Sequence, residues 1–176
     1  MKASHFSKDI QEFIMLLAKH NVKYVIVGGE AVIYYGYARL TGDVDFFFGT
    51  SKENAQRLYN ALDEFWRGDI PGVNSFEEVM ASGTILQFGL PPNRIDLVNQ
   101  IDGVTFEEAW MGKTTISVGI SDESIPVHFI GLDQLITNKE AIKRPKDLED
   151  LKYLKKAKVK NPSYVWEEQS HDSSVS

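Results

Sequence analysis

Two glycines and two aspartates lie close together in the chain, in an order that suits phosphate chemistry. Asp43 and Asp45 are separated by one residue in the run DVDFFF, and Gly28-Gly29 follow the apolar run YVIV. Side chains alternate between the two faces of a strand, so the two carboxylates point the same way. Like charges placed that close repel unless a cation lies between them, which predicts a divalent-metal site. The glycines leave the backbone bare enough for a phosphate to approach.

A third carboxylate, Asp96, lies in a second apolar run, RIDLV. A carboxylate inside such a strand is costly to bury unless it is paired or bound to a metal ion. Three carboxylates brought together would hold one or two Mg²⁺ ions, which prefer oxygen ligands and share substrate phosphates. The three runs together therefore predict a metal site that handles a phosphorylated substrate.

Simpler explanations of the same residues stay open at this point. Glycine at a strand-to-helix turn often serves backbone geometry alone. Asp43 and Asp45 would also suit an edge strand with two solvated carboxylates, although the bulky neighbours Val44 and Phe46 make an exposed edge less favourable. The glycines and the pair of acids indicate a metal site only in combination with Asp96.

The surrounding pattern predicts one α/β (α+β) domain over residues 1–160. Apolar residues at helical spacing predict helices over residues 9–20, 30–37, 51–65, 132–143 and 145–157. Apolar runs rich in β-branched and aromatic residues predict strands over residues 22–27, 43–48, 84–90, 94–100, 114–120 and 126–130. We expect a mixed sheet of five or six strands with helices packed mainly on one face. Residues 161–176 have little to bury and are predicted to form a flexible tail.

Composition narrows the class of protein. The 176 residues contain no apolar run of about eighteen residues, so we expect no membrane segment, and the first residues lack the apolar core of a signal peptide. The absence of cysteine excludes disulfides and thiolate metal sites and is typical of a cytoplasmic protein, which is our expectation for localisation.

The charge is unevenly distributed along the chain. The net charge is −6, yet residues 139–160 hold nine Lys and Arg against four Asp and Glu. An acidic body argues against a broad nucleic-acid-binding surface, whereas a local basic strip suits a nucleotide or one end of an RNA. Within that strip, Asp147 and Asp150 are typical of the first turns of a helix, and we interpret them in that way.

The stretch VGGEAVIYYGYARLTGDVDFFF resembles the signature of the polymerase-β-like nucleotidyltransferase superfamily. That signature is an apolar strand, Gly-Gly or Gly-Ser, a spacer, Asp-apolar-Asp, and a third Asp on a later strand. The chain is further similar to the small minimal, AbiEii-toxin-like nucleotidyltransferases, whose pattern SKENAQRLYNAL, RIDLV and LITNKEAIKRPKDLEDLKYL match in order. The resemblance covers most of residues 10–157. It implies transfer of a nucleoside monophosphate from a nucleoside triphosphate, such as ATP, to a hydroxyl group, with release of pyrophosphate.

The resemblance also implies roles for the acids and glycines. Asp43, Asp45 and Asp96 would ligate Mg²⁺, as one or two ions for which Mn²⁺ is expected to substitute. Asp96 would also help to deprotonate the acceptor hydroxyl. Gly28 and Gly29 would cradle the β- and γ-phosphates.

Four further residues are candidates for binding the nucleotide or the acceptor: Arg39, Thr41, Lys139 and Arg144. Each has an ordinary alternative. Thr41 suits a loop-closing hydroxyl, and Arg39 suits an ion pair with Glu30 or an acidic surface. Lys139 suits an exposed helix face, and Arg144 suits the end of a helix for reasons of the helix dipole.

The acceptor stays open at the level of sequence. The resemblance implies a tRNA end, a protein hydroxyl or a small molecule such as an antibiotic. A toxin of a toxin–antitoxin pair would have an antitoxin partner, and a homo-oligomer is the other expected assembly. The alternative function is a catalytically silent member of the same fold that binds a nucleotide or a protein.

Overall fold

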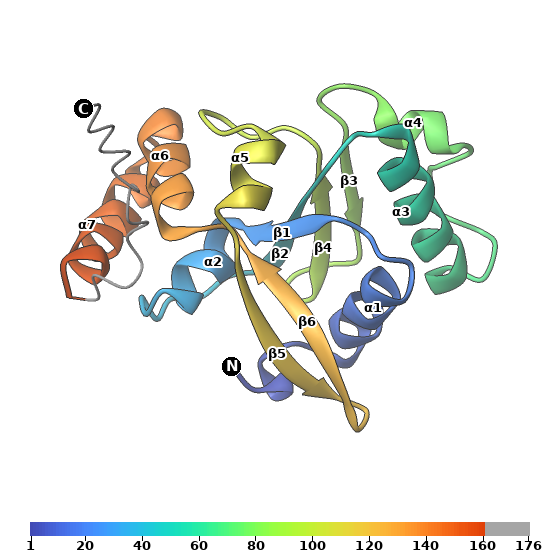
Figure 1. The fold of residues 1–176 in the computed structure, drawn as a ribbon, viewed down its shortest axis with the longest axis horizontal. Coiled ribbons are helices and arrows are strands. Elements are labelled where there is room, and N and C mark those ends of the chain that lie inside the picture. Colours follow the sequence, from blue (N-terminus) through green and yellow to red (C-terminus); the bar gives the residue numbers. More distant parts are fainter. Residues whose placement is uncertain (161–176) are drawn as a thin grey trace, which may run out of the picture.

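The computed structural model of the chain describes residues 1–160, and a six-stranded mixed sheet runs through its middle (Figure 1). The predicted tail, residues 161–176, lies outside the described residues. The elements in chain order are η1 (Ala3–His5), α1 (Lys8–Lys19), β1 (Tyr24–Val27), α2 (Gly28–Tyr34), β2 (Asp43–Phe48), α3 (Lys52–Phe65), α4 (Phe76–Met80), β3 (Ile85–Phe88), β4 (Arg94–Val98), α5 (Phe106–Met111), β5 (Thr114–Ile120), β6 (Glu123–Phe129), α6 (Leu132–Ile142) and α7 (Pro145–Lys160).

The strands follow the spatial order β3-β4-β2-β1-β6-β5. The pairs β1–β2, β3–β4 and β5–β6 are antiparallel, whereas β1–β6 and β2–β4 are parallel. The prediction of a mixed sheet of five or six strands is therefore confirmed, with six. The parallel pair β2–β4 brings together two segments that are about fifty residues apart in the chain.

Neighbouring residues of β2 show how helices cover the sheet. Phe46 meets Phe13 of α1 edge to face at 5.4 Å between ring centroids, and Phe47 meets Phe106 of α5 at 5.3 Å. Because successive strand residues point to opposite faces, α1 and α5 lie on opposite sides of the sheet. Helix α1 packs on α3, which contacts α4, so α1 and α3 form a helical layer on the Phe46 face. The face of Phe47 is also the face of Asp45.

Two helix starts differ from the sequence expectation. Helix α1 begins at Lys8 because the hydroxyl of Ser7 accepts a hydrogen bond from the backbone N–H of Ile10. Helix α2 begins at Gly28 rather than at Glu30, so the glycines form its first turn instead of a preceding loop. Strand β1 therefore passes directly into α2 at the point where the predicted site lies.

Candidate active site

The three predicted metal ligands lie on one face of the sheet. In the parallel pair β2–β4, Asp45 stands opposite Asp96, and Asp43 stands two residues earlier on β2. The period of two places all three side chains on the same face. One carboxylate oxygen from each lies within 4.8 Å of the others. Strand pairing thus brings the three acids together.

Arg94, which was not among the predicted site residues, lies among these acids. It stands opposite Asp43 in the same register. Its Nη2 donates to Asp43 Oδ2 at 2.6 Å, and its Nε and Nη2 donate to the two oxygens of Asp96 at 2.7 and 2.9 Å. Gln87 of β3 adds a further hydrogen bond to Asp96 Oδ2 at 3.1 Å. The signal was present in RIDLV, because Arg94 precedes Asp96 by two residues and so shares its face.

Asp45 differs from the other two acids. Among residues 1–160, no side chain forms a hydrogen bond or ion pair with its carboxylate. Burial first, and then the charges of Asp43 and Asp96, raise the pKa of Asp45 to about 7. The ionised form of this carboxylate therefore lacks a counter-charge in direct contact, as expected of a ligand without its cation.

The two glycines allow close packing around the acids. Gly28 has a φ of +63°, and a Cβ atom at this position would collide with the carboxylate of Asp45. A Cβ at Gly29 would lie 2.7 Å from Thr41 Oγ1 and 3.1 Å from Arg39 Nη2. Gly28 therefore needs glycine for geometric reasons, whereas a side chain at Gly29 would have to displace the side chains of Thr41 and Arg39. Both glycines leave bare backbone next to the acids and the loop after α2.

The loop that holds Thr41 and Arg39 contacts both the acids and α7. The hydroxyl of Thr41 donates to Asp43 Oδ1 at 3.1 Å. Arg39 forms an ion pair with Asp150, with 3.2 Å between Nε and Oδ1. The alternative pairing of Arg39 with Glu30 is wrong, because Glu30 accepts a 2.6 Å contact from His5 instead.

Lys139 belongs to a buried ionic cluster between α6 and α7. Its Nζ lies 2.7 Å from Asp147 Oδ1 and 2.9 Å from Asp150 Oδ2. Arg144 Nε donates to Asp147 Oδ2 at 2.7 Å, and Arg39 reaches Asp150 from the other side. The alternative of an exposed Lys139 is therefore wrong. Asp147 and Asp150 are buried partners of the predicted basic residues as well as acids of the first turns of α7.

All nine residues predicted from the sequence line one cavity of about 410 Å³. The cavity lies at the point where β1, β2 and β4 meet α2, α6 and the start of α7. Its lining consists of Gly28, Gly29, Arg39, Leu40, Thr41, Gly42, Asp43, Asp45, Arg94, Asp96, Lys139, Arg144 and Lys146. Residues from five separate stretches of sequence thus converge, and their individual roles stay predictions.

Comparison with protein families decides the class. Residues 6–159 match the family described as "Nucleotidyltransferase of unknown function (DUF6036)". The chain belongs to this nucleotidyltransferase family. The family covers almost the whole described part of the chain, which confirms the resemblance to the nucleotidyltransferase superfamily drawn from the Gly-Gly and Asp-x-Asp runs.

The chain was also compared with curated proteins and with solved structures. No curated protein matches this nucleotidyltransferase significantly. Among solved structures, the crystal structure of ANT(2″)-Ia in complex with adenylyl-2″-tobramycin is similar, with a TM-score of 0.46 and 16% sequence identity over 88% of this chain and 94% of that chain. Within residues 1–160, no helix is long and apolar enough to cross a membrane.

The acidic side chains of this nucleotidyltransferase fit a divalent cation. Asp43, Asp45 and Asp96 offer hard oxygen ligands within 4.8 Å of one another, which Mg²⁺ and Mn²⁺ accept. The carboxylate of Asp45, unpaired among the described residues, would gain the counter-charge that it lacks. Arg94 already neutralises part of the charge on the other two acids.

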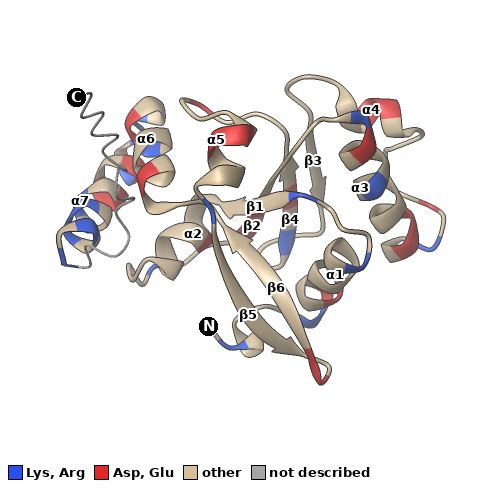
Figure 2. Ribbon diagram, viewed as in Figure 1, with Lys and Arg blue, Asp and Glu red and all other residues tan. Residues whose placement is uncertain are grey.

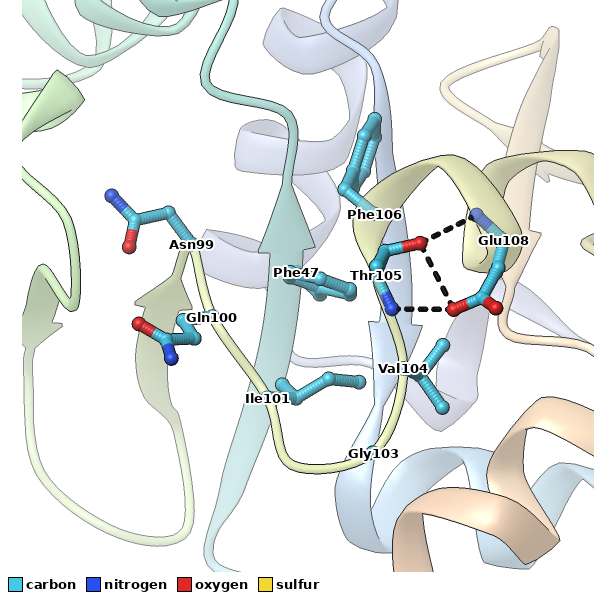
Figure 3. A pocket seen from close by; sticks show the side chains of 9 residues that line it. All are labelled: Phe47, Asn99, Gln100, Ile101, Gly103, Val104, Thr105, Phe106 and Glu108. Carbon is cyan, nitrogen blue, oxygen red and sulfur yellow. Dashed lines mark hydrogen bonds between the residues drawn. The ribbon is translucent and has the colours of Figure 1, made fainter.

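Two more cavities lie near the site. One of about 450 Å³ shares Gly28, Asp45, Lys139 and Arg144 with it, and apolar residues such as Ile85 add to its wall. A second, of about 350 Å³, lies over Phe47 and is shown in Figure 3. There the backbone N–H and hydroxyl of Thr105 donate to Glu108, so these polar groups already have partners. The cavity next to Asp45 is therefore the more suitable extension of the site.

Proposed function

We propose that the chain transfers a nucleoside monophosphate from a nucleoside triphosphate to a hydroxyl group, using Mg²⁺ held by Asp43, Asp45 and Asp96. The convergence of these three acids with the Gly28-Gly29 turn in one cavity carries the proposal. When bound, the divalent cation would supply Lewis-acid stabilisation of the negative charge that develops on the transferred phosphoryl group.

The basic residues support a triphosphate in the same cavity. Arg39, Lys139 and Arg144 are held by the carboxylates of Asp147 and Asp150, so three positive charges are opposed by two negative ones. This arrangement fixes the basic groups in position before the substrate arrives, which is the condition for effective electrostatic stabilisation. We assign Arg39 and Arg144 to the phosphates, with Lys139 as the buried charge behind them.

The bare backbone at Gly28 and Gly29 would receive the β- and γ-phosphates beside Thr41. A side chain at either glycine would collide with Asp45 or Thr41, so glycine keeps these groups close to the bare backbone. The adjoining cavity of about 450 Å³ offers room for the nucleobase or the body of the acceptor.

The proposed step requires one proton acceptor. The acceptor oxygen forms a bond to the α-phosphorus, its proton passes to Asp96, and the bond between the α-phosphorus and the bridging oxygen breaks, so that pyrophosphate leaves with the electron pair. Arg94 and Gln87 donate to the carboxylate of Asp96 and hold its orientation. Asp96 would therefore receive the proton from a fixed direction.

A phosphate-rich acceptor such as an RNA end is favoured by the basic residues along α7 (Figure 2). Two of these lysines are already paired, Lys155 with Glu140 and Lys158 with Asp133. The strip would therefore guide one end of an acceptor rather than bind a long duplex. A role as a toxin predicts growth arrest on expression, relieved by a partner antitoxin, whereas a role in resistance predicts tolerance of an antibiotic.

Label transfer tests the proposed function. The chain is incubated with α-labelled nucleoside triphosphates, Mg²⁺ or Mn²⁺, and total RNA, cell lysate or aminoglycosides as acceptors. We expect labelled product and pyrophosphate from the wild type, and at least a roughly 100-fold loss in Asp45→Asn and Asp43→Asn.

The matched control is Arg57→Gln, which removes a partly exposed charge whose hydrogen bonds in the described structure go to Glu53 and the carbonyl of Asn21. It is expected to transfer label like the wild type. Full label transfer by a folded Asp45→Asn variant would contradict the assignment of the site.

A further inference from the structure

Arg94 occupies the centre of the acidic group in a fixed geometry. The guanidinium donates three hydrogen bonds of 2.6–2.9 Å, which reach Asp43 and both oxygens of Asp96. A planar guanidinium matches a carboxylate with two parallel hydrogen bonds, and such charge-assisted bonds are among the strongest in proteins. Its side chain is 28% exposed, so the pairing lies at the wall of the cavity rather than in the core.

The contacts of Arg94 divide the three acids into unequal groups. Asp96 has both oxygens engaged by the positive charge of Arg94, and Gln87 adds a third hydrogen bond. In Asp43, Arg94 engages only Oδ2, and Oδ1 accepts a hydrogen bond from the neutral hydroxyl of Thr41. Among residues 1–160, Asp45 receives no hydrogen bond from a basic side chain. The open ligand positions therefore lie on the side of Asp45 and Asp43, away from the guanidinium.

The net charge of the three acids and Arg94 indicates how many divalent cations the site can hold. Three carboxylates and one guanidinium carry −2, which a single divalent cation balances. A second cation on the Asp96 side would have to share both ligand oxygens with a positive group, at a distance where like charges repel strongly. The substrate triphosphate brings further negative charge, so a second ion would enter only together with the nucleotide.

We propose that Arg94 is a positioning residue that limits the site formed by Asp43, Asp45 and Asp96 to one resident divalent cation in the absence of nucleotide. The guanidinium of Arg94 bridges the carboxylates of Asp96 and Asp43. Its positive charge thus takes the place of a second resident ion. This inference rests on the proposed function, because it assumes that the three acids bind a divalent cation.

Titration with Mn²⁺ without nucleotide tests the inference independently of catalysis. Calorimetry and the electron paramagnetic resonance of free Mn²⁺ report the number of bound ions and their affinity. The wild type is expected to bind one Mn²⁺ per chain. Arg94→Gln is expected to bind a second ion, or to bind the first at least tenfold more tightly, because a neighbouring positive charge is removed. Arg94→Lys keeps the charge and is expected to bind one ion.

The control is Arg57→Gln, a loss of one exposed positive charge away from the acids, which is expected to bind like the wild type. Circular dichroism verifies that each variant is folded. If Arg94→Gln does not fold, the wild-type count and Arg94→Lys still decide. Two ions or none in the wild type, identical binding in folded Arg94→Gln, or a second ion in Arg94→Lys would overturn the inference.

Label transfer is measured separately on the same preparations. If the wild type transfers label but binds two resident ions, the role of Arg94 is overturned and the proposed function is not contradicted. One bound Mn²⁺ without transfer to any acceptor would support the cation site and contradict the proposed function instead.

Discussion

Lys139 and Asp147 form an ion pair of 2.7 Å in which neither side chain is more than 2% exposed. Asp150 adds a second carboxylate to Lys139 at 2.9 Å, and it also pairs with Arg39. A buried charge of this kind is tolerated only while its partners are present. The cluster therefore ties α6 and α7 to the loop that carries Arg39 and Thr41, which makes the late helices part of the site.

Removal of one partner from this cluster should destabilise the fold. Asp147→Asn leaves Lys139 with one buried carboxylate fewer, and we expect a loss of about 3–5 kcal/mol in the free energy of unfolding, measured with urea. The control is Glu140→Gln, which breaks the half-exposed pair with Lys155 and should cost less than about 1 kcal/mol. Equal losses in the two variants would contradict a special role for the buried pair.

His128 should make the stability depend on pH. Burial first, and then the charge of Lys113, lower the pKa of His128 from 6.5 to about 4. The unfolded chain therefore binds a proton on this ring more readily than the folded chain does, so unfolding takes up a proton between these pH values. The free energy of unfolding should fall as the pH falls from about 6.5 to about 4.

Replacement of the ring tests this pH dependence. His128→Gln cannot be protonated in this range, so its unfolding curve should lack the part of the slope due to His128. The measurement is urea unfolding of both proteins at several pH values. A variant with the same slope as the wild type would show that other groups cause the pH dependence.

Gly28 should be intolerant of a side chain. Gly28→Ala places a Cβ against the carboxylate of Asp45, at a backbone φ of +63°. We expect a loss of at least about 2 kcal/mol in stability together with at least about tenfold slower label transfer, because both strain and a displaced carboxylate result. Gly36→Ala is the control: its φ is +100°, but nothing lies within 4 Å of the added Cβ. It should lose stability from backbone strain without the displacement of Asp45.

Divalent cations should stabilise the folded chain. A ligand that binds only the folded state raises the melting temperature as its concentration rises. We expect Mn²⁺ or Mg²⁺ to raise the melting temperature of the wild type and not that of Asp45→Asn, and we expect chelation to abolish label transfer reversibly. A cation-induced shift of equal size in Asp45→Asn would place the ion elsewhere.

Most of the fold was predictable from local patterns. The runs DVDFFF and RIDLV became β2 and β4, and the six predicted strand regions match the six strands in type and order. These predictions succeed because buried strands and amphipathic helices each follow a period set by backbone geometry. The short helix α4 was not predicted. Its five residues are too few for helical periodicity to show.

The candidate site, like the fold, was predictable only in part. The alternation of Asp43 and Asp45, and the glycines before them, could be read from spacing alone, because one strand and one turn determine where these groups point. Spacing could not show which charges pair. Arg39 meets Asp150 across more than one hundred residues, and Arg94 meets Asp43 only because β4 pairs with β2 in parallel.

The sequence by itself determined the class of chemistry: three strand-borne carboxylates next to a glycine turn, in the order of a nucleotidyltransferase. Only the tertiary structure decided the electrostatic state of each group. It buried Lys139 between Asp147 and Asp150, placed Arg94 on two of the three acids, and left Asp45 without a basic partner among residues 1–160. The physical reason is that side-chain types follow the chain, whereas the energy of a charge depends on its neighbours in space and on its burial.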